Sequence, residues 1–166
     1  MLFKLKSYFK FLLKSTNEHG VHSPFVFNYL TKCLYKKPRK SKDKTLDILL
    51  KSIAYFKFTK INVIGNSVFK KELEKKYPNL VFDAKNPDLL FYENSEFVKP
   101  VNVISHSNLH NDSIIILNNI HKNSKSHNYW SNFKKWKEVS VSIDMYYCGV
   151  IFIRREQQKE HFTIRI

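Results

Sequence analysis

The residues best placed to bind a ligand follow a short β-branched run at positions 60–67, which reads Lys-Ile-Asn-Val-Ile-Gly-Asn-Ser. The run stops at Gly65, and a helical pattern follows over positions 68–77. In an α/β sheet such a strand–turn–helix junction lies at the carboxyl edge, where these folds bind ligands. Helix N–H groups there can hold an anionic or polar ligand if the backbone can approach it. A nucleotide-binding loop carries several glycines, whereas this one has only Gly65, with Phe69 where a second would help, so the sequence indicates a fold more firmly than an activity.

Histidines and a cysteine are the other chemically able side chains. His106 and His110 are four residues apart in a loosely helical segment, which suits metal ligation, but no nearby Cys or third His completes the set. His19 and His22 lie just before a predicted helix. They could be ligands or a general base, and loop histidines that hydrogen-bond the backbone are the alternative. Cys148 has no His close in sequence, which argues against a catalytic thiol.

The elements that must position these residues begin with three helices. Residues 2–14 form an amphipathic pattern; such a helix most often covers part of its own protein, and the alternative is a basic, aromatic helix that rests on a membrane. Ser23 is the expected N-cap and Pro24 the first residue of a helix over 24–35. A basic linker over 36–44 should be solvated, and a third helix is predicted over 45–56. The apolar face of the first helix consists of Leu2, Leu5, Phe9, Leu12 and Leu13.

From residue 60 the pattern alternates strand with helix, which is typical of βαβ units and a parallel sheet. Strands are expected at 61–64, 80–82, 89–92 and 114–117, and helices at 68–77, loosely at 96–109, and at 125–137. The last helix should pack Trp130, Phe133 and Trp136 on the sheet. Residues 139–145 and 150–154 read as an antiparallel hairpin, and 161–166 as a final strand. We therefore expect an N-terminal helical segment over 1–58 that packs on an α/β domain over 59–166, with a mostly parallel sheet and helices on both faces.

Length and composition limit the class of protein. A chain of 166 residues suits one domain with its own core, and 43% hydrophobic residues exclude a disordered protein. No apolar run reaches the roughly 18 residues that a membrane span needs. Two cysteines are too few for a disulfide framework. A cytoplasmic location is the expectation that follows.

The charge of the chain raises the question of its partner. The net charge is +15, from 29 basic and 14 acidic residues, which suits nucleic acid or an anionic membrane surface. The alternative is that lysine is simply the favoured polar residue. Only four of the basic residues are arginines, which supply bidentate contacts to phosphate and guanine, so specific nucleic-acid recognition is disfavoured.

Both ends of the chain carry motifs of a known family. Residues 19–27 read His-Gly-Val-His-Ser-Pro-Phe-Val-Phe, and the tail has the patterns Val-x-Val-x-Ile-Asp at 139–144, Gly-x-x-Phe-x-Arg-Arg at 149–155 and His-Phe-x-Ile-Arg at 161–165. The chain resembles a bacterial family of class I S-adenosylmethionine-dependent methyltransferase-like proteins over nearly its whole length. The resemblance implies a Rossmann-like methyltransferase fold, with S-adenosylmethionine as cofactor and transferase activity on a methyl acceptor that the sequence does not identify.

The resemblance also assigns the site residues. Of the glycine-rich loop, Gly65 and Ser67 remain, whereas the acidic position falls on Val63 and the later glycine on Phe69. Asp83 corresponds to the acid that holds the ribose hydroxyls, and Glu93 to the acid after the fourth strand. Cofactor binding is thus expected at Gly65, Ser67, Asp83 and Glu93.

Two departures from the family bear on activity. No room is left for the usual third strand and its helix. The family's Asp-Asp-Ile-His tract is replaced by Asn118-Asn119-Ile120-His121, which removes the charge needed to bind a metal or accept a proton. The two asparagines should face a solvated cleft, and His121 is the candidate catalytic base. No metal site is expected.

Three functions follow. The first is a shortened methyltransferase-like protein in which cofactor binding and methyl transfer are weak or lost, because Phe69 should add bulk in the cofactor's path. The second is an active methyltransferase that uses His121 as base. The third is a basic module that binds nucleic acid or an anionic membrane surface.

Overall fold

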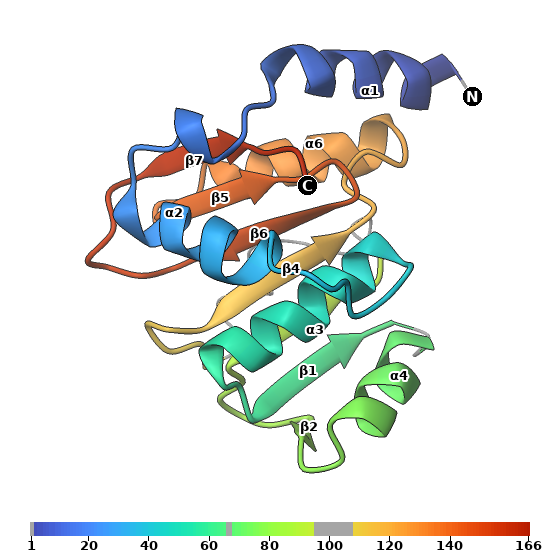
Figure 1. Cartoon of the computed structure of the whole chain (residues 1–166), viewed down its shortest axis with the longest axis vertical. Helices are drawn as coiled ribbons and strands as arrows, with labels where there is room; N and C mark the ends of the chain where they lie inside the picture. Colours follow the sequence, from blue (N-terminus) through green and yellow to red (C-terminus); the bar gives the residue numbers. More distant parts are fainter. Residues whose placement is uncertain (1, 66–67, 95–107) are drawn as a thin grey trace.

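The computed structural model describes residues 2–65, 68–94 and 108–166. Within them, seven strands form one sheet in the order β2-β1-β3-β4-β6-β5-β7 (Figure 1). All neighbouring pairs are parallel except those of β6, which runs antiparallel to β4 and β5. The chain is therefore an α/β protein with a mostly parallel, mixed sheet, as predicted. The strands are β1 (Lys60–Ile64), β2 (Val81–Phe82), β3 (Leu89–Tyr92), β4 (Ile114–Asn118), β5 (Val141–Asp144), β6 (Cys148–Phe152) and β7 (Glu160–Thr163).

The predicted strands and the C-terminal hairpin are confirmed to within a few residues. β4 lies in the middle of the sheet and all of its residues are buried, which explains its continuous apolar run. β5 and β6 form the antiparallel hairpin, and β7 adds to β5 in parallel. The loosely helical segment predicted at 96–109 lies almost entirely outside the described residues.

The helices follow the predicted order, and two of them begin at the caps Ser23 and Asp43. Ser23 accepts a hydrogen bond from the N–H of Val26 at 3.4 Å, and Asp43 from that of Leu46 at 2.8 Å, so each supplies an acceptor that a helix start lacks. The elements are α1 (Leu2–Lys14), a 3₁₀ turn η1 (Glu18–Gly20), α2 (Pro24–Tyr29), a π-helical turn η2 (Leu30–Leu34), α3 (Lys44–Phe56), α4 (Val68–Lys76) and α6 (Ser124–Lys134).

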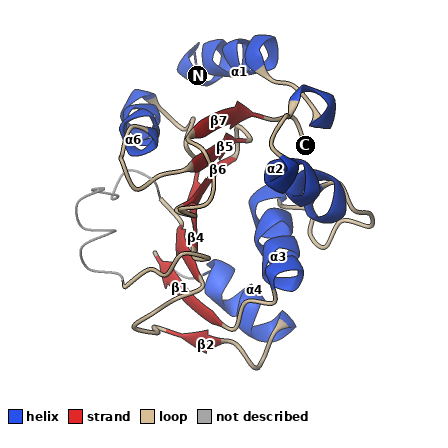
Figure 2. Ribbon diagram, turned by 90° about the vertical axis from the view of Figure 1, so that its left-hand side faces the viewer, coloured by secondary structure: helices blue, strands red, loops and turns tan. Residues whose placement is uncertain are grey.

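Helices cover both faces of the sheet (Figure 2). On one face α2, η2, α3 and α4 enclose the larger hydrophobic cluster, which includes Leu49, Leu73 and Phe91. On the other face α6 buries Trp130 and Phe133, with Trp136 packed beside them, as predicted. Helices α2 and α3 and the turn η2 therefore share one core with the sheet. How the chain divides into domains stays a prediction.

A close approach between α6 and the hairpin explains one of the three glycines. A Cβ on Gly149 would lie 2.4 Å from the Trp130 ring, closer than carbon atoms approach, so β6 must carry glycine there for the buried indole to fit.

Helix α1 does not cover the protein with the apolar face that the sequence analysis expected. It lies across the edge of the sheet beyond β7 (Figures 1 and 2), and its buried residues are Ser7 and Phe11. The apolar face expected to cover the protein points outward instead: Leu13 is 87% exposed, Leu2 67%, Phe9 58% and Leu5 55%. No described helix is both long enough and apolar enough to span a bilayer.

Candidate functional site

The order of the strands creates one place where a ligand crevice is expected. β1 leads through α4 to β2 on one side of the sheet, whereas β3 continues to β4 on the other side. Adjacent strands whose connections leave in opposite directions open a crevice at their carboxyl ends. Gly65 follows β1 there, and Glu93 follows β3 with its N–H donating to the Ile64 carbonyl at 3.0 Å. The structure thus brings together two of the four predicted cofactor residues.

Gly65 and Glu93 are in direct contact. Gly65 has φ +148°, a conformation that side chains rarely adopt, and a Cβ built on it would lie 2.6 Å from Glu93 Cβ and Oε2. The glycine is therefore required by the approach of the glutamate. The Glu93 side chain occupies space next to the backbone that a ligand would otherwise approach.

The other predicted cofactor residues differ in position. Asp83 follows β2 with φ 56°, its carboxylate is 76% exposed, and Lys70 of α4 contacts it at 3.2 Å. Ser67 lies outside the described residues. Phe69 packs on Phe91 with ring centroids 4.9 Å apart, so its ring is part of the hydrophobic core. Whether Phe69 also adds bulk in the path of a cofactor stays a prediction.

The two asparagines at the end of β4, Asn118 within the strand and Asn119 just after it, do not share one environment. Asn118 is 8% exposed, and its Oδ1 accepts a hydrogen bond from the Thr45 hydroxyl at 2.9 Å, so the prediction that it faces a solvated cleft is wrong. Asn119 is exposed and has φ 58°, the left-handed conformation that Asn tolerates better than most residues. Its N–H donates to the Tyr147 carbonyl at 2.8 Å. Asn118 thus ties the start of α3 to the sheet.

His121 is buried beneath α1 and hydrogen-bonded through both ring nitrogens. Its Nε2 lies 2.8 Å from Asp144 Oδ2 at the end of β5, and its Nδ1 lies 2.5 Å from Ser7 Oγ of α1. A carboxylate only accepts hydrogen bonds, so Nε2 carries the proton. In the neutral ring Nδ1 is then an acceptor, and the Ser7 hydroxyl donates to it.

Neighbouring groups hold this chain of hydrogen bonds in place. Asp144 also accepts from the Trp130 Nε1–H at 3.2 Å and from the Tyr146 N–H at 2.9 Å. The Tyr146 ring stacks on His121 at 5.0 Å, and its hydroxyl donates to the Lys4 carbonyl of α1 at 3.0 Å. Sequence reasoning missed Ser7 and Asp144. The one available signal was that Asp144 ends the Val-x-Val-x-Ile-Asp pattern.

The order Ser7–His121–Asp144 resembles a nucleophile, a base and an orienting acid. Acyl transfer would also need donors for an oxyanion beside the serine. Ser7 lies within α1, where the backbone N–H groups around it are used inside the helix. The arrangement can therefore position a hydroxyl and hold a proton, but the backbone N–H groups beside Ser7 are not free to bind an oxyanion.

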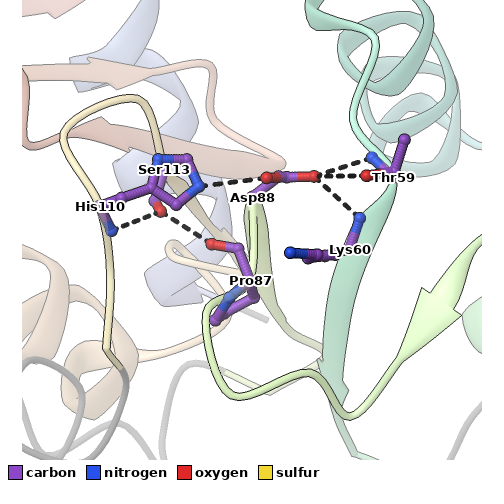
Figure 3. Close-up of polar contacts among 6 residues, drawn as sticks. All are labelled: Thr59, Lys60, Pro87, Asp88, His110 and Ser113. Carbon is purple, nitrogen blue, oxygen red and sulfur yellow. Dashed lines mark hydrogen bonds and ion pairs between the residues drawn. The ribbon is translucent and has the colours of Figure 1, made fainter.

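A second histidine–carboxylate pair lies at the other end of the strands, where β1, β3 and β4 begin (Figure 3). Asp88 Oδ2 accepts from the N–H groups of Thr59 and Lys60, both at 2.8 Å, and Asp88 Oδ1 lies 3.1 Å from His110 Nε2. Ser113 accepts from the His110 N–H and donates to the Pro87 carbonyl. These bonds join the starts of β1, β3 and β4, so the cluster holds strands in register.

The other titratable candidates offer little chemistry. His106 lies outside the described residues, and no group of three metal-binding side chains occurs in the part of the chain that is described. His19 and His22 are both exposed. Burial raises the pKa of Cys33 to about 12 and raises that of Cys148 further, so neither thiol ionises near neutral pH.

Comparisons with known proteins give no further guidance: no family model matches the chain, and neither the curated proteins nor the solved structures give a significant match.

Proposed function

We propose that this protein is a class I S-adenosylmethionine-dependent methyltransferase-like protein in which methyl transfer is weak or lost. The proposal rests on the sequence resemblance and on a strand order consistent with a Rossmann-like sheet that ends in an antiparallel hairpin. The cytoplasmic location stays a prediction.

The observation that carries the proposal is the contact between Gly65 and Glu93. It lies at the crevice where a doubly wound sheet binds ligands, which supports a common plan. The same contact supports a loss of binding, because the glutamate covers the glycine. The expected ribose acid, Asp83, is on the surface and paired with Lys70.

Isothermal titration with S-adenosylmethionine and S-adenosylhomocysteine tests this proposal. We expect no binding in the micromolar range. Binding at micromolar or tighter concentrations would overturn the reduced-site proposal and favour the active enzyme. In that case Asp83→Ala should abolish binding, since the ribose would lose its acceptor, and the matched control Asp112→Ala, which changes another exposed aspartate, should leave binding intact.

A labelled-methyl transfer assay on a broad panel of acceptors then separates the two methyltransferase alternatives. Turnover by the parent protein would establish the active enzyme, for which His121 is the candidate base. Its two ring nitrogens are engaged by Asp144 and Ser7, so we expect no turnover.

A second candidate function is binding to an anionic membrane surface, and the outward face of α1 favours it. Leu2, Leu5, Phe9 and Leu13 are exposed together on a helix that also carries Lys4, Lys6, Lys10 and Lys14. An apolar helix face flanked by lysines suits the interface of an anionic bilayer. Exposed leucines have no comparable role on RNA or DNA, so this observation favours a membrane over nucleic acid.

Vesicle flotation with phosphatidylcholine, alone and mixed with phosphatidylserine, tests the membrane candidate. We expect binding only to the anionic vesicles, with a steep salt dependence, and loss of binding in Leu5→Glu/Leu13→Glu. Val68→Glu is the matched control, since Val68 is an exposed apolar residue of α4. Binding that survives the α1 substitutions would contradict the candidate, as would salt-dependent retention on heparin with no binding to the anionic vesicles.

A further inference from the structure

A cavity of about 430 Å³ lies under α1, between that helix, α6 and the end of β5. It is separate from the Gly65 crevice, and its size suits a small ligand. Ser7, His121 and Asp144 form part of its wall, so the hydrogen-bonded chain described above opens on it. We call it the α1 cavity.

The α1 cavity is strongly cationic. Lys6, Lys10 and Lys14 line it from α1, and Lys134 lines it from α6. None of these four lysines forms an ion pair with another described residue. Asp144 is the one carboxylate in the described lining, and its oxygens already accept from His121, Trp130 and Tyr146.

Lys134 is the most enclosed of these cations. It is partly buried, with its ammonium group 5.7 Å from the centre of the Trp130 ring. Burial lowers the pKa of Lys134, Asp144 opposes this shift, and Lys14 adds to it. A like charge held near a partly buried lysine is unfavourable unless an anion lies between them.

A second, independent observation comes from His127, which also lines the α1 cavity. Its ring lies against His121 with centroids 4.8 Å apart, and its Nδ1 is buried with no hydrogen-bond partner among the described residues. Burial lowers the pKa of His127, as do the nearby His121, Lys134 and Lys10 against the opposing effect of Asp144, so the ring is neutral at neutral pH. A buried ring nitrogen without a hydrogen-bond partner is unfavourable, and a bound polar ligand would remove that cost.

We infer that the α1 cavity binds the phosphoryl group of a small molecule or lipid headgroup, held by Lys10, Lys14 and Lys134 with His127 as a hydrogen-bonding partner. A phosphoryl group carries up to two charges and several acceptor oxygens, which suits a set of lysines converging from two helices better than a single carboxylate does. The site does not depend on methyl transfer, because it uses none of the residues at the Gly65 crevice.

The inference is tested by titrating the full chain with inorganic phosphate and with glycerol 3-phosphate. Binding is measured by calorimetry and by chemical-shift changes in two-dimensional NMR spectra. We expect saturable binding, with shifts at Ser7, His127 and Lys134. Lys10→Gln and Lys134→Gln should each weaken binding about tenfold, the loss of one charge-assisted contact. Lys137→Gln is the matched control, since that side chain is 91% exposed near the end of α6, and it should bind like the parent.

Vesicles that contain phosphatidic acid distinguish the two sources of the phosphoryl group. Saturation by glycerol 3-phosphate identifies a free compound, whereas binding to the vesicles alone, lost in Lys134→Gln, identifies a lipid headgroup. Either result supports the site. No binding of any probe, affinities unchanged in Lys10→Gln and Lys134→Gln, or vesicle binding that depends only on Leu5 and Leu13, would overturn it. Thermal melts of the variants check that each one folds.

Discussion

Two aspartate–histidine pairs lie at opposite ends of the strands of the same sheet. Asp88 and His110 are 22 residues apart and meet where β1, β3 and β4 begin, at 3.1 Å. His121 and Asp144 are 23 residues apart and meet where β4 and β5 end, at 2.8 Å. Residue type and spacing are almost the same in the two pairs.

The difference between the pairs lies in what the other atoms of each pair contact. Asp88 accepts two backbone N–H groups, and its histidine is 42% exposed, so this pair closes the protein's own chain. His121 is 7% exposed, and its second nitrogen meets a hydroxyl on a separate helix beside a cationic cavity. The two pairs have the same residue types. What distinguishes the structural pair from the candidate binding site is the end of the strands at which each lies and the further group that each pair contacts.

The largest expected effect is that of Asp144→Ala. The substitution leaves His121 Nε2, Trp130 Nε1 and the Tyr146 N–H without their shared acceptor in a buried place. We expect the free energy of unfolding to fall by about 3 kcal/mol, measured by urea denaturation. Glu138→Ala, which removes a more exposed carboxylate, should change it by less than about 1 kcal/mol. A loss for Asp144→Ala no larger than that of the control would mean that the buried chain does not stabilise the fold.

A smaller effect is expected for Asp88→Ala at the opposite edge. The N–H groups of Thr59 and Lys60 lose their acceptor, but both are exposed to solvent, so water can replace part of the lost hydrogen bonding. We expect a loss of about 2 kcal/mol in urea denaturation. Asp112→Ala is the control for removing a nearby exposed charge. If Asp88→Ala costs more than Asp144→Ala, the order of the two pairs is reversed.

Ser7→Ala should cost about 1 kcal/mol, since it removes one hydrogen bond while Tyr146 and Phe11 still hold α1. Faster hydrogen exchange confined to α1 is the expected signature. The ¹⁵N shifts of His121 should report a proton on Nε2 in both proteins. Unchanged exchange in α1 would show that the Ser7 contact does not dock the helix.

The smallest expected effect is a pH dependence from Asp88. Burial would raise the pKa of Asp88, but the backbone N–H groups of Thr59 and Lys60 and the contact with His110 together lower it below its ordinary 3.8. Stability from this shift is present above pH 3.8 and is lost as the pH falls through the lower pKa of the folded state. Melting curves below pH 5 should therefore show a steeper acid loss in the parent than in Asp88→Asn. Parallel curves would contradict the shift.

The sequence by itself determined the local elements. The bounds of β3 match the predicted 89–92, the Ser23 cap lies where Ser-Pro placed it, and the hairpin follows from its turn and alternating residues. Each of these depends on neighbours within a few positions, where periodicity and capping act. The resemblance added the meeting of Gly65 with Glu93, which no local pattern contains.

Only the tertiary structure decided which surfaces those elements present. The outward face of α1 could not be predicted, because hydrophobic periodicity gives a helix an apolar face without saying what lies opposite it. Asn118 reads as exposed after a strand until Thr45, 73 residues earlier, is found to cover it. Ser7 and His121 are 114 residues apart, so their contact depends on where the first helix packs on the sheet.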